Sequence, residues 1–333
     1  MTTFPVQYST LSTRALEAFI IQQYGEPALT CRLLLKGVSD TYLVEKCGQP
    51  RYIFKVYRRK HRSLYEIQGE VELLNHLHEG GAAVAYPIAD REGRQIQDFN
   101  APEGLRHGVL FSYAQGQPVY DLTTRQLQLL GREMARVHNI TSAITLTHER
   151  ETFDIQRLLL QPLQVLAPAY KDYPEGYTYL TTTAEKVVDR LNALPTADFS
   201  TGYVQYDFLP KNFHFDASDR ITFFDFDFAG KGWLANDHAS FFIHFFFHVA
   251  HNKITPADAD RDFAIFIAAY RSVRGFSDAE LTAVPYLGFI FWIFYLAYQY
   301  EHFEDWSNFF FSNRYLVERV GVIRRYTELH CAL

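Results

Sequence analysis

The feature that most limits how this chain can fold is a change of residue pattern near position 110, with no flexible linker at the change. Before it, short segments rich in β-branched and aromatic residues, such as Tyr52–Tyr57, are separated by turn signals. Residues 64–78 differ, because their apolar side chains recur at helical spacing. Helical patterns dominate after Gly116-Gln117-Pro118, at 124–138, 176–193, 234–250, 257–273 and 286–303. We therefore expect an α+β protein with a small antiparallel β lobe, a larger mainly helical lobe and a cleft between them.

Composition supports a sizeable core and argues against several kinds of partner. The chain has 333 residues, 48% of them hydrophobic, which is enough for two lobes. Its net charge of −6 and the absence of a basic run argue against a nucleic-acid partner. Cys31, Cys47 and Cys331 show no metal-binding spacing and fit a reducing compartment. The start lacks a signal-peptide pattern, and the most apolar run, Leu287–Ala297, is shorter than the roughly 20 residues of a membrane span. We expect a cytoplasmic protein with no membrane partner.

Residues 203–230, YVQYDFLPKNFHFDASDRITFFDFDFAG, concentrate the side chains that could carry chemistry. Asn212 follows Asp207 by five residues, and Asp225 lies another 13 residues on. Two short predicted strands between Asn212 and Asp225 form a hairpin, so its two ends could face one point. Phosphoryl transfer needs a carboxylate to orient the attacking hydroxyl and accept its proton, and further oxygen ligands to hold Mg²⁺. Hard oxygen ligands suit Mg²⁺, and neither a thiolate nor clustered histidines compete here.

This segment resembles the catalytic loop and metal-binding strand of the aminoglycoside phosphotransferase and choline/homoserine kinase group, H-G-D-x-x-x-x-N followed by D-F-[DE]-x-A-G. The resemblance implies a protein-kinase-like fold, with Asp207 as catalytic base and Asn212 and Asp225 as Mg²⁺ ligands. It implies transfer of the γ-phosphate of ATP or GTP to a hydroxyl of a small molecule, such as an aminoglycoside, amino alcohol, amino acid or sugar. Gln205 and Tyr206 replace the usual His and Gly. These departures, together with the single glycine of the loop KGVSDTYLV, leave a second hypothesis open, a catalytically weak nucleotide-binding pseudokinase that acts as a scaffold.

Lys55 lies within an otherwise apolar predicted strand, where an inward ammonium is costly unless it meets an anion. An exposed edge-strand lysine is the alternative. Glu70 begins an apolar-periodic helix that resembles the helix supplying the kinase glutamate, and a Lys–Glu pair would hold Lys55 against the α- and β-phosphates. Glu66 and Glu72 are rivals for this pairing, Glu66 because residues four apart share a helix face.

The remaining predicted nucleotide contacts come from two segments of the chain. Ser39 and Asp40, in KGVSDTYLV, resemble the family's short phosphate-covering loop, although an ordinary hairpin turn fits them equally well. Ser112, Tyr113 and Ala114 resemble the segment that meets the nucleotide base. The resemblance thus divides the chain into a nucleotide-binding lobe at 1–110, a hinge at 111–118 and a catalytic and substrate lobe at 119–333.

Outside these motifs, three side chains have open interpretations. Asp237 resembles the aspartate that braces the catalytic loop; it could also cap a helix, and both roles can hold together. His138 is expected to have a core or capping role, and Asp227 either reaches a ligand or satisfies local backbone amides. The resemblance covers about residues 33–250. Beyond it, the aromatic residues that could stack on a substrate or simply pack are Trp292, Trp306, Tyr298 and the run Phe309 to Phe311.

Overall fold

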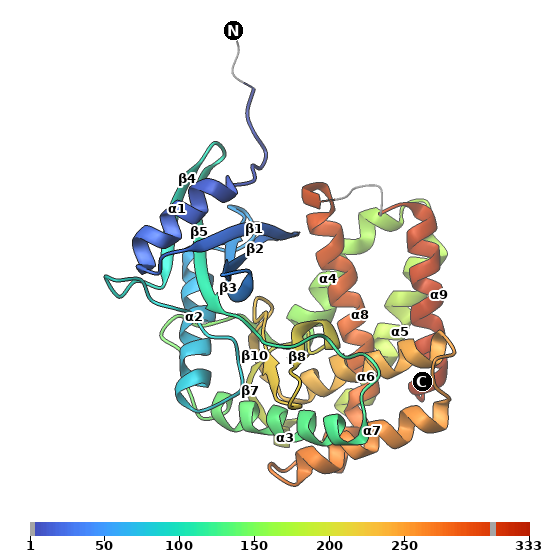
Figure 1. The fold of residues 1–333 in the computed structure, drawn as a ribbon. Coiled ribbons are helices and arrows are strands. Elements are labelled where there is room, and N and C mark those ends of the chain that lie inside the picture. Colours follow the sequence, from blue (N-terminus) through green and yellow to red (C-terminus); the bar gives the residue numbers. More distant parts are fainter. Residues whose placement is uncertain (1–3, 307–310) are drawn as a thin grey trace. The chain divides into compact units, whose positions relative to one another are not determined.

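The computed structural model describes residues 4–306 and 311–333, except for the side chains of residues 303–306 (Figure 1). The side chain of Trp306 and the residues Phe309 and Phe310, for which a stacking role was considered, therefore lie outside the described part. The chain divides into two compact units. The first comprises residues 1–115, 145–149 and 222–224, and the second comprises residues 116–144, 150–221 and 225–333.

The first unit contains a five-stranded antiparallel sheet in the order β1-β2-β3-β5-β4 and two helices. The strands are β1 (Leu29–Lys36), β2 (Ser39–Lys46), β3 (Gln49–Tyr57), β4 (Ile96–Ala101) and β5 (Gly104–Ser112). The helices are α1 (Thr13–Tyr24) and α2 (Leu64–Glu79). The sheet agrees with the antiparallel β pattern read from the sequence, including its one internal helix at 64–78.

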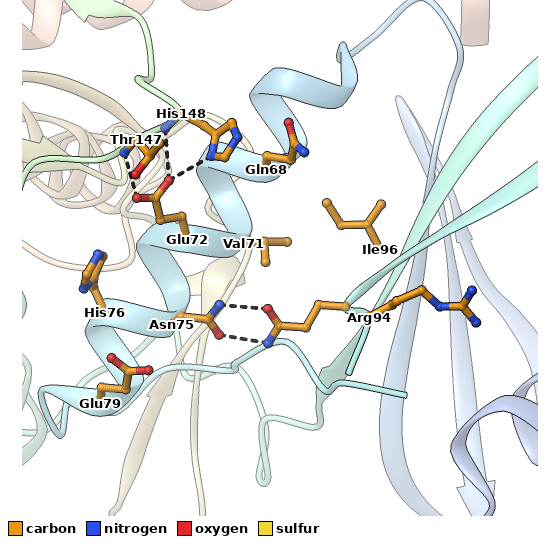
Figure 2. A pocket seen from close by; sticks show the side chains of 11 residues that line it. Gln68, Val71, Glu72, Asn75, His76, Glu79, Arg94, Ile96, Thr147 and His148 are labelled. Carbon is orange, nitrogen blue, oxygen red and sulfur yellow. Dashed lines mark hydrogen bonds and ion pairs between the residues drawn. The ribbon is translucent and has the colours of Figure 1, made fainter. Parts of the chain in front are cut away.

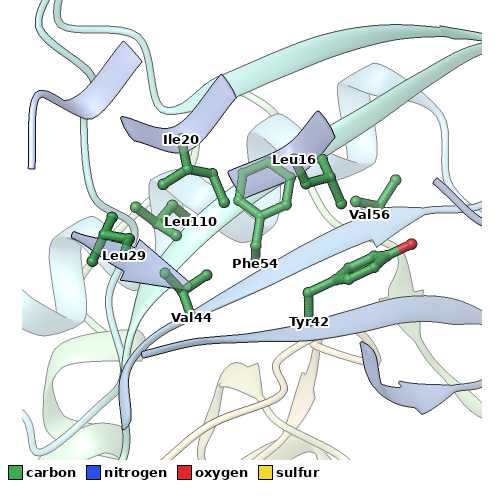
Figure 3. Packing of buried hydrophobic residues seen from close by; sticks show 8 residues of the cluster. All are labelled: Leu16, Ile20, Leu29, Tyr42, Val44, Phe54, Val56 and Leu110. Carbon is green, nitrogen blue, oxygen red and sulfur yellow. The ribbon is translucent and has the colours of Figure 1, made fainter. Parts of the chain in front are cut away.

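The core of the first unit lies between helix α1 and the sheet (Figure 3). Leu16 and Ile20, four residues apart, project from one face of α1. They meet side chains from β2, β3 and β5, including Tyr42, Phe54 and Leu110, which stand opposite one another in the strand register. Alternating side chains of a strand share a face, so this register turns one face of the sheet toward α1.

Helix α2 begins with a capping box, in which the Ser63 hydroxyl accepts from the Glu66 amide and the Glu66 carboxylate accepts from the Ser63 amide. Ile67, Leu74 and Leu77 are buried at helical spacing. The helix ends before Gly80-Gly81, as the sequence predicts.

The second unit is mainly helical. Its α-helices are α3 (Thr124–Thr141), α4 (Gln161–Leu166), α5 (Pro174–Asn192), α6 (Ala235–Ala250), α7 (Pro256–Arg271), α8 (Asp278–Trp306) and α9 (Asn313–His330). Short strands β6 (Thr152–Phe153), β10 (Gly230–Trp233) and β7 (Thr201–Val204) form a three-stranded sheet in that order. Strands β8 (Phe213–Phe215) and β9 (Ile221–Phe223) form the predicted hairpin. These observations confirm the α+β class.

Helix α8 is longer than the sequence predicts, because it begins at Asp278 and continues through Pro285. Within the described part of the chain, its segment Asp278–His302 alone has the length and apolar composition of a possible membrane span. However, 72% of its most apolar window is buried inside the protein, as in the core helix of a globular domain. It packs against α4, α5, α6 and α9.

Candidate active site

The loop that follows β7 brings Asp207 and Asn212 into direct contact. Asp207 is 4% exposed, and its Oδ2 accepts a hydrogen bond from Asn212 Nδ2 at 2.9 Å. The same Nδ2 donates to the Asp207 carbonyl at 2.8 Å. Both bonds use the amide nitrogen of Asn212, so its side-chain oxygen is the atom that can serve as a ligand.

The other oxygen of Asp207, Oδ1, is buried and has no hydrogen-bond partner among the residues that the structure describes. Burial raises the pKa of Asp207, and the nearby Asp225 charge adds to this, while the Lys211 ammonium and the Asn212 amide oppose it. A buried carboxylate oxygen without a partner is costly, typically about 1–3 kcal/mol or more when charged. Such an atom is explained if a ligand donates to it, as a hydroxyl group would.

Asp225 lies just beyond the hairpin, exposed and close enough for its charge to act on Asp207. Its φ of 60° is in the left-handed region, which is uncommon for residues other than glycine and often marks functional sites. The predicted trio Asp207, Asn212 and Asp225 therefore gathers within the second unit.

The donor set of this trio fits a magnesium ion that is shared with a nucleotide. Asn212 and Asp225 offer hard oxygens, which Mg²⁺ prefers. In residues 4–306 and 311–333, no cluster of three or more His, Cys, Asp or Glu side chains could hold a metal by itself. Mg²⁺ commonly uses one or two carboxylates and completes its octahedron with water and phosphate oxygens, so two protein ligands suffice.

Gln205, at the position of the family's histidine, links the loop to the metal-binding segment. Its Nε2 donates to the carbonyl of Asp225 at 3.2 Å. The glutamine amide therefore connects the Asp225 backbone to the loop.

Tyr206, at the position of the family's glycine, has a φ of 68°, a conformation that glycine adopts without strain. Its ring packs in the second unit, with centroids 4.9 Å from Phe153, 5.0 Å from Phe294 and 5.5 Å from Phe291. The bulk that the sequence places beside Asp207 is thus taken up by an aromatic cluster. Both departures from the family pattern are thus accommodated in the fold.

Asp237 braces the loop from helix α6. Its carboxylate accepts from the amides of Tyr206 at 2.7 Å and Gln205 at 3.0 Å. His138 Nε2 lies 3.0 Å from the same carboxylate, and its Nδ1 lies 2.8 Å from the Tyr270 hydroxyl. The capping alternative is wrong, because Leu234 occupies the cap position and Asp237 lies inside the helix. His138 is fully buried, as its expected core role requires.

Arg150 supports the segment after Asp225. Its guanidinium donates to the carbonyls of Asp227 at 2.5 Å and Ala229 at 2.7 Å. Asp227 is itself buried, at 3% exposure. The burial of Asp227 is compatible with either of the roles considered for it.

In the first unit, Lys55 Nζ lies 3.6 Å from Glu70 Oε1, with both side chains largely buried. The Tyr57 hydroxyl donates to Glu70 Oε2 at 2.9 Å. The exposed-lysine alternative therefore does not hold. Of the rivals, Glu66 pairs with Arg62 at 3.1 Å and caps α2.

Glu72, the second rival, is engaged at the edge of a cavity of about 490 Å³ in the first unit (Figure 2). Its carboxylate accepts from the amides of Thr147 at 2.7 Å and His148 at 3.0 Å, and it lies 3.0 Å from His148 Nδ1. Burial alone would raise the pKa of Glu72, but these hydrogen bonds outweigh it and lower the pKa to about 2. Glu72 thus ties α2 to residues 147–148.

Replacing Glu72 with glutamine should lower the free energy of unfolding at pH 7 by about 2 kcal/mol. A carboxylate with a lowered pKa stabilises the fold above its unfolded pKa, near 4.3, and this contribution is lost as the pH falls toward 2. Urea unfolding at pH 7 and pH 3 should therefore show a difference between wild type and Glu72→Gln that shrinks in acid. Glu79→Gln, at an exposed position of the same helix, is the control. An equal difference at both pH values would contradict this.

The predicted phosphate loop differs from expectation at Asp40. Its carboxylate is fully buried, 2.9 Å from Arg106 Nη2, and it accepts from the Tyr8 hydroxyl at 3.1 Å. The ion pair holds it inside the first unit, so Asp40 does not turn outward as the sequence suggested. Ser39 is also buried, and its hydroxyl has no hydrogen-bond partner in the described chain. A phosphate contact by Ser39 stays a prediction.

The expected base-binding segment begins where β5 ends. The Ser112 amide donates to the Tyr86 carbonyl at 2.9 Å, and the Ser112 hydroxyl accepts from the Tyr86 amide at 3.0 Å. Ser112 is therefore anchored within the first unit. Contacts of Tyr113 and Ala114 with a nucleotide base, and a hinge at 111–118, stay predictions.

Two residues of the site were missed in the sequence. Lys211 Nζ lies 2.7 Å from Asp207 Oδ2 and 3.4 Å from the Tyr295 hydroxyl. Burial disfavours the Lys211 ammonium, but the Asp207 carboxylate outweighs that effect and raises the pKa of Lys211. Burial, and then the Asp207 charge, also raise the pKa of Tyr295. Lys211 lies between the motif residues Asp207 and Asn212, and this position in the loop was the sequence signal that could have identified it.

Residues 30–276 match the profile of the phosphotransferase enzyme family. The chain belongs to this family. An uncharacterized protein of Synechocystis is 35% identical over 240 residues, which cover 72% of this chain and 66% of that protein. The match confirms the family resemblance carried by Asp207, Asn212 and Asp225.

Solved structures of two small-molecule kinases share its fold. An amicoumacin kinase, determined in complex with AMP-PNP, Ca²⁺ and Ami, has a TM-score of 0.76 at 18% identity, covering 95% of this chain and 93% of that one. A microcompartment-associated aminopropanol kinase has a TM-score of 0.73 at 22% identity, covering 95% and 96%. At these identities the likeness shows the fold, which confirms the expected kinase-like class.

Proposed function

We propose that this protein is a cytoplasmic kinase that transfers the γ-phosphate of ATP, or of GTP, to a hydroxyl group of a small molecule. One observation carries the proposal. Asp207 is held by Asn212 and Lys211 through one oxygen, while its other oxygen is buried without a partner, close to Asp225. This is the arrangement that a general base for a hydroxyl acceptor needs.

In the proposed reaction, Asp207 accepts the hydroxyl proton as the acceptor oxygen attacks the γ-phosphorus. A bond forms between that oxygen and phosphorus, the bond from phosphorus to the β,γ-bridging oxygen breaks, and the nucleoside diphosphate leaves. Mg²⁺, when bound, neutralises charge on the phosphates. Asn212 and Asp225 would hold it, and Lys55, oriented by Glu70, would hold the α- and β-phosphates.

Lys211 has a positioning part in this proposal. Its ammonium fixes Asp207 Oδ2 and favours the ionised carboxylate against the effect of burial. The bond from Asn212 acts on the same oxygen. Because both partners bond Oδ2, Oδ1 is the oxygen left to accept the hydroxyl proton of the acceptor.

An ADP-release assay with Mg-ATP, run over amino alcohols, amino acids, sugars and aminoglycosides, tests the function. Release that depends on an acceptor, with a phosphorylated product seen by mass spectrometry, is the expected result. Binding of Mg-ATP without turnover above water-driven hydrolysis for every acceptor would instead favour a nucleotide-binding scaffold.

A further inference from the structure

A cavity of about 390 Å³ opens in the second unit, directly against the catalytic loop. Leu209, Pro210 and Lys211 form one wall, and these residues lie between Asp207 and Asn212 in the sequence. Lys211 also contacts Asp207 at 2.7 Å, so the same side chain lines the cavity and touches the proposed base. The volume suits a small molecule.

The lining of this cavity contains several basic residue types. It contains two lysines and three histidines, together with aromatic and aliphatic side chains, and no aspartate or glutamate. Lining residues contact two carboxylates: Asp207 lies 2.7 Å from Lys211 Nζ, and Asp121, which is 80% exposed, lies 3.6 Å from His248 Nδ1. A positively charged group inside the cavity would therefore meet two lysine side chains and no carboxylate of the lining itself.

The basic side chains of the lining differ in whether a carboxylate already pairs with them. The Lys211 ammonium is balanced by Asp207. Lys253, exposed at the rim just after helix α6, forms no ion pair with any residue that the structure describes. Burial lowers the pKa of His244 to about 3 and also lowers the pKa of His248, so both rings are neutral at pH 7. His244 already bonds the Tyr120 backbone, and His248 Nδ1 faces Asp121. Lys253 is the cation left to meet a ligand.

We propose that this cavity binds the phosphate acceptor and that the acceptor carries an anionic group, a carboxylate or a phosphate, in addition to its hydroxyl. The anionic group meets Lys253, and the hydroxyl reaches Asp207 past Lys211. This proposal rests on the proposed kinase function and narrows its acceptor class. It sets the site apart from one built for polycationic acceptors, which would need carboxylates in the lining.

Matched acceptors that differ only in charge test this. Candidates are 4-hydroxybutyrate, 4-hydroxybutyramide and 4-aminobutan-1-ol, with glycerol 3-phosphate and glycerol as a second pair. We expect kcat/KM for each anionic member to exceed that of its neutral and cationic partners by about tenfold, equivalent to about 1.4 kcal/mol. The two sets distinguish a carboxylate from a phosphate. Higher kcat/KM for the amine or the neutral compounds would overturn the proposal while leaving the kinase function intact.

The residue-level test is Lys253. Lys253→Gln should raise KM for the anionic acceptor by about tenfold and Lys253→Glu by more, with kcat changed by about twofold at most. Lys186→Gln, an exposed lysine on α5 outside the cavity, is the matched control and should change neither value. Equal KM values for wild type and Lys253→Glu would overturn the proposal.

Binding measured by calorimetry without nucleotide separates this inference from the kinase function. Anion binding that weakens in Lys253→Glu, in an enzyme that releases no ADP with any acceptor, would support the cavity and reject the kinase. Failure of both 4-hydroxybutyrate and glycerol 3-phosphate to bind or to be phosphorylated would reject the cavity proposal.

Discussion

Asp207→Asn should lower kcat by about 10²–10⁴-fold while leaving nucleotide affinity almost unchanged. Asparagine keeps the shape of the side chain and can still accept from Asn212 and Lys211, but it cannot take the proton of an attacking hydroxyl. The loss therefore falls on the chemical step. Single-turnover phosphate transfer measures it, and calorimetry with a non-hydrolysable nucleotide measures the binding that should persist.

Two features make the Asp207 result specific. Asp189→Asn, at an exposed position of α5, removes the same charge away from the site and should have no effect. Burial raises the pKa of Asp207, so this base becomes protonated at a higher pH than an ordinary aspartate. As the pH is lowered, wild-type activity should therefore begin to fall above the pH at which an ordinary aspartate would be protonated. Normal turnover by Asp207→Asn would exclude a general-base role.

The second large effect is expected at Asp225. Asp225→Asn should weaken nucleotide binding in the presence of Mg²⁺ by at least about tenfold, because a charged oxygen ligand is lost. Asparagine is the appropriate replacement, since it tolerates the left-handed backbone that Asp225 adopts. The measurement is calorimetric titration with a non-hydrolysable ATP analogue, carried out with Mg²⁺ and again with EDTA.

The matched control for this variant is Asp219→Asn. Asp219 also has a positive φ, of 56°, and lies in the turn of the same hairpin, but its carboxylate contacts Arg125 and Gln126. Without Mg²⁺, Asp225→Asn and wild type should bind nucleotide alike. A loss of affinity that is equally large in EDTA would mean that Asp225 acts on the fold and not through a metal.

Contacts close in sequence were predictable. The spacing of Asp207, Asn212 and Asp225, with a hairpin between the last two, was enough to bring them together, because each lies on a short, locally determined segment. Lys55 and Glu70 could be paired because a strand and the helix after it have strong periodic patterns.

Contacts between distant segments were not predictable from local patterns. Arg106 reaches Asp40 from 66 residues away and turns a predicted phosphate contact into a buried ion pair. Tyr295 meets Lys211 from 84 residues away on α8, with no local signal for that contact. The sequence pattern predicts a helix at 286–303, yet α8 begins at Asp278, passes through Pro285 and packs against neighbouring helices.

The claim on which the function depends is that Asn212 and Asp225 share one divalent cation beneath the phosphates of a nucleotide, beside Asp207. Anomalous diffraction from crystals grown with Mn²⁺ and a non-hydrolysable ATP analogue locates that cation. We expect a metal peak within about 2.5 Å of Asn212 Oδ1 and of an Asp225 carboxylate oxygen. A nucleotide-bound metal held by other residues, with Asp225 turned away from it, would contradict the proposed site.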